Sequence, residues 1–165
     1  MSQTRSFVIN ALLIVAFAAG LAVAFFVNRP SAKSAAVSAD VEYLTPFGAP
    51  TRPFSPAVRV GDVIYLSGQI GTDPAASANA VVPGGIEAET RQTLNNIKRT
   101  VEAVGSSMDK VVKCTVMMAD MAEWDRMNVV YREFFTPGKL PARSAFGTSG
   151  LALNARVEIE CIATR

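Results

Sequence analysis

The chain has 165 residues, a length typical of one domain. Half of the residues are hydrophobic and 18% are charged, which excludes an intrinsically disordered chain. There is no histidine, so Ser-His-Asp and Cys-His catalysis and histidine-ligated zinc are excluded. Three of the 16 basic residues precede Asp40, which leaves 13 basic against 14 acidic residues from there on. This balance argues against a nucleic-acid partner.

An uncharged apolar run at residues 7–27 follows a short polar leader at residues 1–6. As a helix the run would span about 30 Å, the thickness of the hydrocarbon core of a bilayer. We predict one transmembrane anchor here, with a cleaved signal segment as the alternative. Residues 28–40 are small and polar, typical of a flexible tether, and the folded domain is expected at 41–165. We expect this domain at the outer, periplasmic face, although positive charge flanks both ends of the run and leaves the cytoplasmic face open.

Patterns beyond the tether predict the element order β-β-α-β-α-β-β. Strands are expected at 57–60, 63–67, 111–118, 142–147 and 156–164. Apolar residues at helical spacing predict helices over 86–104 and 124–135, ended by Gly105 and by Pro137-Gly138. Two helices on one mixed sheet make a two-layer α+β domain. The sheet face without helices would stay partly exposed in a monomer, so we expect a homo-oligomer.

Two cysteines are present, Cys114 and Cys161, and they are 47 residues apart. This spacing differs from a CxxC redox pair, and two cysteines are too few for an all-cysteine tetrahedral metal site. We interpret both as small buried hydrophobic residues. Nothing in the composition requires a metal or another cofactor.

Two short segments could carry chemistry without histidine or a metal. In Pro141-Ala142-Arg143-Ser144 an arginine lies where a loop enters a strand, and a planar guanidinium can hold a carboxylate with two hydrogen bonds. Glu158 and Glu160 project from one face of the final strand, where a partly desolvated carboxylate could transfer protons near neutral pH. A solvated or structurally paired role is the alternative for each group. Three aromatic residues are interpreted as members of the core, namely Tyr65, Trp124 and Tyr131.

Six segments follow one another in a specific order and spacing: 59–70 (RVGDVIYLSGQI), 89–97 (ETRQTLNNI), 111–116 (VVKCTV), 127–135 (MNVVYREFF), 141–144 (PARS) and 157–163 (VEIECIA). In this arrangement they resemble the RidA/YjgF family of small trimeric enamine/imine deaminases. The resemblance covers nearly all of the part beyond the tether. It implies a chorismate-mutase-like α+β barrel, assembled as a homotrimer with sites in clefts between subunits.

The resemblance also assigns roles to particular residues. It implies that Arg143 binds the carboxylate of a substrate and that Glu158 activates water, with Glu160 as the alternative on the same strand face. Ser67, in the Ser-Gly-Gln motif, and Asn128, in the second predicted helix, match further substrate-binding positions. The implied reaction is hydrolytic deamination of small 2-imino or enamine acids, such as 2-iminobutanoate and 2-iminopropanoate, to 2-oxo acids and ammonia.

The chain departs from the family pattern at three places. Segment 52–56 reads Arg-Pro-Phe-Ser-Pro where relatives often have Gly-Pro-Tyr-Ser-Gln, so Phe54 replaces a tyrosine that lines the site. Ala145 replaces the cysteine that commonly follows Pro-Ala-Arg-Ser, and Phe146-Gly147 replaces the usual aliphatic and acidic positions. A catalytically weak trimeric protein that binds a ligand or acts as a scaffold at the membrane is therefore an alternative function. An endoribonuclease, an activity ascribed to some relatives, is a further alternative that the charge balance disfavours.

Overall fold

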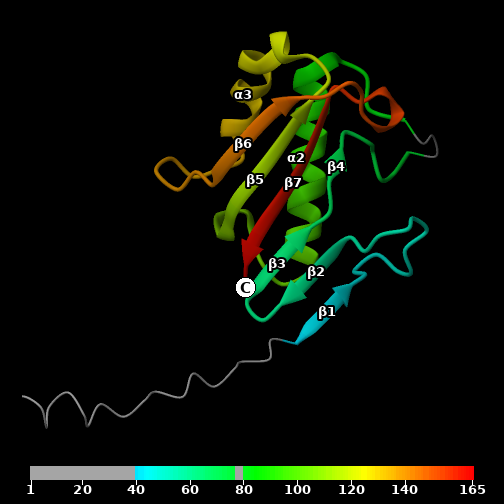
Figure 1. The fold of residues 1–165 in the computed structure, drawn as a ribbon, viewed down its shortest axis with the longest axis vertical. Helices are drawn as coiled ribbons and strands as arrows, with labels where there is room; N and C mark the ends of the chain where they lie inside the picture. The colour runs from blue at the N-terminus through cyan, green and yellow to red at the C-terminus, as the bar shows by residue number, and fades with distance from the viewer. Residues whose placement is uncertain (1–39, 77–79) are drawn as a thin grey trace, which may run out of the picture. The chain divides into compact units, whose positions relative to one another are not determined.

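The computed structural model describes residues 40–76 and 80–165 (Figure 1). Its strands are β1 Val41–Leu44, β2 Ala57–Val60, β3 Val63–Leu66, β4 Gln69–Ile70, β5 Val111–Met118, β6 Ala142–Gly147 and β7 Val157–Thr164. Its helices are α2 Gly85–Ala103 and α3 Trp124–Arg132. Single turns of 3-10 helix cover Met108–Lys110, Met121–Glu123 and Ala152–Asn154.

The strands form one mixed sheet in the order β1-β2-β3-β7-β5-β6, and β4 also pairs with β7. Among the described strands only β5 and β6 run parallel, and α3 lies in the connection between them because parallel neighbours need a crossover. The other described pairs are antiparallel. The two eight-residue strands, β5 and β7, occupy the middle of the sheet, and β1 and β6 form its edges (Figure 1).

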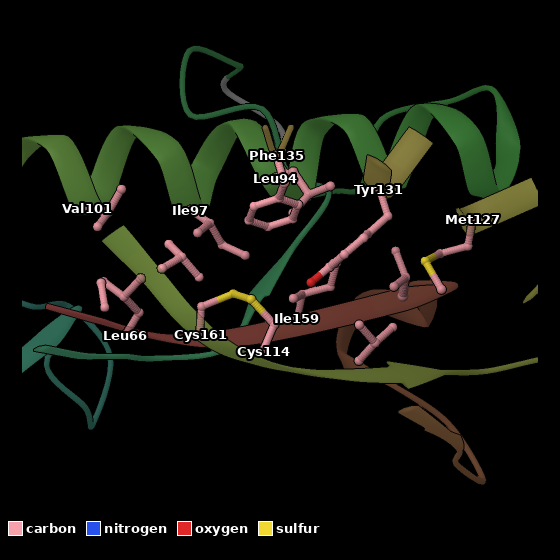
Figure 2. Packing of buried hydrophobic residues seen from close by; sticks show 14 of the residues in the cluster. Leu66, Leu94, Ile97, Val101, Cys114, Met127, Tyr131, Phe135, Ile159 and Cys161 are labelled. Carbon is pink, nitrogen blue, oxygen red and sulfur yellow. A yellow bond between two sulfur atoms is a disulfide. The ribbon is translucent and has the colours of Figure 1, made fainter. Parts of the chain in front are cut away.

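Buried and less buried side chains alternate along β7 and define the two faces of the sheet. One face is buried under the helices and is called the helix face; from β7 it carries Val157, Ile159, Cys161 and Ala163. The opposite face, called the open face, carries Glu158, Glu160 and Ile162 from the same strand. Helix α2 packs on the helix face through buried residues at helical spacing, Ile86, Leu94, Ile97 and Val101 (Figure 2). On the open face Tyr65 remains 49% exposed, so its interpretation as a core residue is wrong.

The predicted α+β architecture and its element order are confirmed, with two additional strands. Strand β1 was not predicted, because three of its four residues are exposed and it is held by backbone pairing with β2. Strand β4 has only two residues, too few for a recognisable alternation. Helix α3 ends at Arg132 and not at Phe135 as predicted. The next three amides donate to carbonyls three residues earlier, which tightens the last turn into 3-10 geometry.

The interpretation of the cysteines as separate hydrophobic residues is wrong in one respect. Cys114 and Cys161 are buried, as expected, but they form a disulfide (Figure 2). They lie directly opposite each other on the antiparallel strands β5 and β7, with Cα atoms 4.1 Å apart. Proximity arises from strand register, which a separation of 47 residues in the sequence does not reveal.

The predicted leader (1–6), anchor (7–27) and nearly all of the tether (28–40) lie outside the described residues. Within 40–76 and 80–165, neither helix has the length and hydropathy needed to cross a membrane. The anchor therefore stays a prediction, and so does the trimer.

Candidate active site

Arg143 is held against helix α3. It is the second residue of β6 and pairs in parallel register with Cys114, which directs it to the helix face. Its Nη1 donates a 2.7 Å hydrogen bond to Oδ1 of Asn128. The guanidinium carbon lies 4.9 Å from the ring centre of Trp124 and 4.7 Å from that of Tyr131. These three α3 residues are spaced by four and three positions, which aligns them on one face of the helix.

The charge of Arg143 has no carboxylate partner within 4.0 Å among the described residues, which include every acidic residue of the chain. Tyr131 cannot neutralise it, since burial raises the pKa of this phenol to about 12, although the positive charge of Arg143 opposes that shift. A guanidinium has five N–H donors, and Asn128 uses one of them. The remaining donors can bind a carboxylate.

Glu158 lies on the open face, opposite Met117 of β5. It is half-buried, and desolvation raises the pKa of its carboxyl above the ordinary value, with a further contribution from the charge of Glu160. A Cβ atom added to Gly68 would lie 2.1 Å from Oε1 of Glu158, so a side chain at position 68 would displace this carboxylate from its place. Glu158 therefore has the partly desolvated surroundings of a carboxylate that can accept and return a proton.

The other predicted site residues are dispersed. The Ser67 hydroxyl donates a 2.7 Å hydrogen bond to the Ser55 carbonyl, and the Ser67 amide donates to the Pro56 carbonyl. These two bonds connect the segment after β3 to the loop before β2. Ala145 is partly buried against the core on the helix face. Phe54 is 47% exposed and lines a pocket on the other side of β4 from Glu158.

Glu160, the alternative base, is exposed on the open face. It lines a pocket of about 180 Å³ together with Tyr65, Lys113 and Thr115, and no arginine contributes to that pocket. The half-buried position of Glu158 beside Gly68 makes Glu158 the stronger candidate of the two.

One chain does not bring Arg143 and Glu158 together. They are two strands apart, and their register partners on β5, Cys114 and Met117, are three residues apart. With about 4.8 Å between strands and about 3.3 Å per residue, their Cα atoms are about 14 Å apart. Their side chains also leave opposite faces of the sheet. The structure thus joins Arg143 with Asn128, and Glu158 with Gly68, as two separate groups.

Sequence reasoning missed three residues of these groups. Tyr131 belongs to the hydrophobic core and Trp124 packs against it, as predicted, but both also flank the guanidinium of Arg143, which was not predicted. Their spacing from Asn128 was a usable signal, because it predicts a shared helix face. The role of Gly68 depends on a long-range contact with β7 and left no local signal.

Comparison with known proteins identifies a family and individual relatives of this chain. Residues 47–165 match the family described as Endoribonuclease L-PSP. A 2-iminobutanoate/2-iminopropanoate deaminase from Mus musculus is 43% identical over 113 residues, 68% of this chain and 82% of that protein. The structure of the YjgF gene product from E. coli is 34% identical, with a TM-score of 0.64, and the match covers 71% of this chain and 91% of that chain.

The structure of E. coli TdcF with bound serine is 29% identical, with a TM-score of 0.64, and the match covers 70% of this chain and 91% of that chain. The family match extends over more than half of the sequence and includes all the strands from β2 to β7. The chain belongs to the Endoribonuclease L-PSP family, which includes the RidA/YjgF proteins.

Proposed function

We propose that the chain hydrolyses small 2-imino acids, such as 2-iminobutanoate and 2-iminopropanoate, to 2-oxo acids and ammonia. The observation that carries the proposal is the unpaired guanidinium of Arg143, fixed by Asn128 and two aromatic rings. Relatives at about 42% identity that carry the name of this deaminase support a deaminase-like enzyme. TdcF, whose solved structure holds serine, is a relative that binds a small molecule with a carboxylate.

In the proposed mechanism the Arg143 fork binds the substrate carboxylate and orients the adjacent C=N carbon. Glu158 accepts a proton from water while the water oxygen attacks that carbon, and it gives this proton to the imine nitrogen, which becomes an amine. Glu158 then accepts the proton of the new hydroxyl group and passes it to the amine nitrogen as the C–N bond breaks, which releases ammonia and leaves the C=O bond of the 2-oxo acid. Orientation and general acid–base catalysis suffice for this reaction because imines are reactive electrophiles.

We propose further that each site is shared between copies, with Arg143 from one and Glu158 from its neighbour, in a homotrimer. The separation of these residues on opposite faces of one sheet supports this arrangement. The open face supports it as well, because it exposes the large side chains of Tyr43 (72%) and Tyr65 (49%). A closed ring of three copies would cover such a face on every subunit.

We also propose that residues 7–27 anchor this domain to a membrane, with residues 28–40 as the tether and the domain on the outer side. The Cys114–Cys161 disulfide supports the outer side, because such bonds persist in oxidising compartments and are rare in the cytosol. A reporter enzyme fused after Arg165 tests the orientation. Activity that requires export is expected, and activity only inside the cell would contradict the proposal.

A deaminase assay on the full-length chain tests the reaction. Threonine dehydratase generates 2-iminobutanoate in situ, and the rate of 2-oxobutanoate formation is measured with and without the chain. Acceleration by the wild type is expected, lost in Arg143→Ala and retained in the matched control Arg132→Ala, an exposed arginine of α3. A correctly folded wild-type chain that binds 2-oxobutanoate without accelerating the reaction would instead support the ligand-binding alternative.

A further inference from the structure

Arg156, the residue directly before β7, joins three parts of the fold. Its amide donates a 2.8 Å hydrogen bond to Oε2 of Glu89 in α2. Its Nη1 donates a 2.6 Å hydrogen bond to Oε1 of Glu123, the last residue of the 3-10 turn before α3. Its carbonyl accepts a hydrogen bond from the amide of Ala119, the residue after β5. Glu89, Glu123 and Arg156 are called the Arg156 cluster.

Both glutamates of the Arg156 cluster are buried, and the arginine compensates their charges. Glu89 and Glu123 are 4% and 8% exposed. Among the described residues, Arg156 donates every hydrogen bond that these two carboxylates accept, and Nη1 of Arg126 lies 3.7 Å from Glu123. A buried carboxylate that loses its partner is strongly unfavourable. Without the Arg156 guanidinium, the two carboxylates would therefore move toward water and displace the segments that carry them.

The cluster also fixes the part of β7 that carries Glu158. Arg156 precedes Glu158 by two residues, and Glu158 pairs with Ile70 of β4. The residue after Ile70 is Gly71, where an added Cβ atom would lie 2.9 Å from the Cα atom and the carbonyl oxygen of Glu89. Glu89 thus contacts the end of β4 directly and the start of β7 through Arg156. The backbone around Glu158 is held against α2 at these two points.

The turn that leads into Arg156 has a strained backbone. Leu153 and Asn154 have positive φ angles of 56° and 54°, in the left-handed region. Asparagine adopts this region more readily than most residues, whereas leucine rarely does. Such a conformation persists only where the surrounding structure holds it. The buried Ala155 and the bonds of Arg156 hold the end of this turn, so their loss would let the start of β7 shift.

We propose that Arg156 is a positioning residue, which holds Glu158 in its half-buried place on the open face through the bonds to the two glutamates of the cluster. The kinetic part of this inference rests on the proposed deamination. Arg143 is held by other contacts, a hydrogen bond to Asn128 and two aromatic rings. Loss of Arg156 should therefore slow proton transfer and leave the binding of the substrate carboxylate nearly intact.

Steady-state kinetics on the full-length Arg156→Gln variant test this role. We expect kcat to fall by about 10- to 100-fold, which a displacement of about 1 Å can cause, and KM to change by less than about threefold. Arg156→Lys keeps the charge and a donor and should recover part of the loss. The matched control is Arg91→Gln, in which an exposed arginine of α2 loses its two hydrogen bonds to Glu133. This control should keep the wild-type kcat.

The pKa of Glu158 gives a readout that does not depend on activity. It can be followed by ¹³C NMR of the side-chain carboxyls, with Glu158→Gln for assignment. In the wild type this pKa is raised, chiefly by burial. Displacement of Glu158 into water in Arg156→Gln should lower its pKa toward the ordinary value, whereas mere removal of a nearby positive charge would raise it further. Arg91→Gln should keep the wild-type pKa.

Two results would overturn the proposal. A wild-type kcat in folded Arg156→Gln would show that Glu158 does not need the cluster. An unchanged or raised Glu158 pKa in this variant would show that Arg156 only stabilises the fold. If the wild-type chain has no deaminase activity, the proposed function fails by itself, and the Glu158 pKa still decides the positioning role. Circular dichroism checks folding, and Glu123→Gln replaces Arg156→Gln in both measurements if the latter does not fold.

Discussion

Arg143 on the helix face and Glu158 on the open face are positioned by different kinds of contact. The arginine has a hydrogen bond to Asn128 and two aromatic neighbours, all from α3 of the same chain. The glutamate is half-buried, and its closest described constraint is the space that Gly68 leaves. The proposed binding group is thus fixed by the fold of one chain, whereas the proposed proton-transferring group lies on the open face.

This difference matches the different requirements of carboxylate binding and proton transfer. A group that holds a carboxylate benefits from rigidity, because its geometry must fit before the substrate arrives. A general base benefits from a surface that a neighbouring copy can dehydrate, since burial is the main cause of its raised pKa. Five experiments test this contrast between Arg143 and Glu158.

The largest effect is expected from Glu158→Gln. Loss of the general base should lower kcat by about 10²- to 10⁴-fold, with little change in KM. The matched control is Glu160→Gln, two residues along the same strand face, which should keep most of the activity. Steady-state kinetics on both variants check this. Equal losses in the two would mean that neither glutamate has a distinct role.

Removal of the disulfide should have the next largest effect, on stability. The bond closes a loop of 47 residues, for which chain entropy predicts a loss of about 4 kcal/mol in the free energy of unfolding in a Cys114→Ala/Cys161→Ala variant. Urea unfolding of oxidised wild type and of the double variant measures it. An unchanged midpoint would show that the helix face does not depend on this bond.

Arg143→Lys should lower kcat/KM by about 10- to 100-fold. An ammonium keeps the charge but cannot form two parallel hydrogen bonds or stack between Trp124 and Tyr131. Kinetics beside Arg132→Lys, an exposed position on the same helix, separate this effect from general perturbation. Wild-type rates in Arg143→Lys would remove the arginine from the site.

Mixing two inactive variants tests whether one site takes Arg143 from one copy and Glu158 from its neighbour. Arg143→Ala and Glu158→Gln chains, unfolded and refolded together in equal amounts, should recover about a quarter of the wild-type activity, since a quarter of randomly assembled sites would be intact. Each variant refolded alone serves as the control. No recovery in assembled oligomers would place both residues of a site in one copy.

The smallest effect concerns pH. Because the pKa of Glu158 is raised, chiefly by burial and then by Glu160, kcat/KM should fall as pH drops through that raised value. Glu160→Gln removes the like charge and should move this fall to lower pH. The sign for stability is the reverse: protonated Glu158 favours the folded state at low pH, and this contribution is lost as pH rises through its folded-state pKa. If kcat/KM falls at the same pH in Glu160→Gln as in the wild type, the charge of Glu160 does not influence the pKa of Glu158.

Local patterns were enough to predict most of the fold. The alternation of apolar and polar residues in β7 and the helical spacing of apolar residues in α2 involve residues that are close in the sequence. Both patterns can therefore be recognised from the sequence alone. Strand β1 and the disulfide depend on pairing between distant segments, which neither composition nor periodicity encodes. The same distinction holds at the site: Asn128 and Arg143 could be named from motifs, but the separation of Arg143 from Glu158 follows only from register across three strands.

Gly68 has a consequence for how the sequence can vary. Its backbone does not require a positive φ, so the crowding at this position comes from the Glu158 side chain. A side chain at position 68 therefore needs the Glu158 carboxylate to move away or to be shortened. Positions 68 and 158 thus form a coupled pair, in which the effect of a substitution at one depends on the residue at the other.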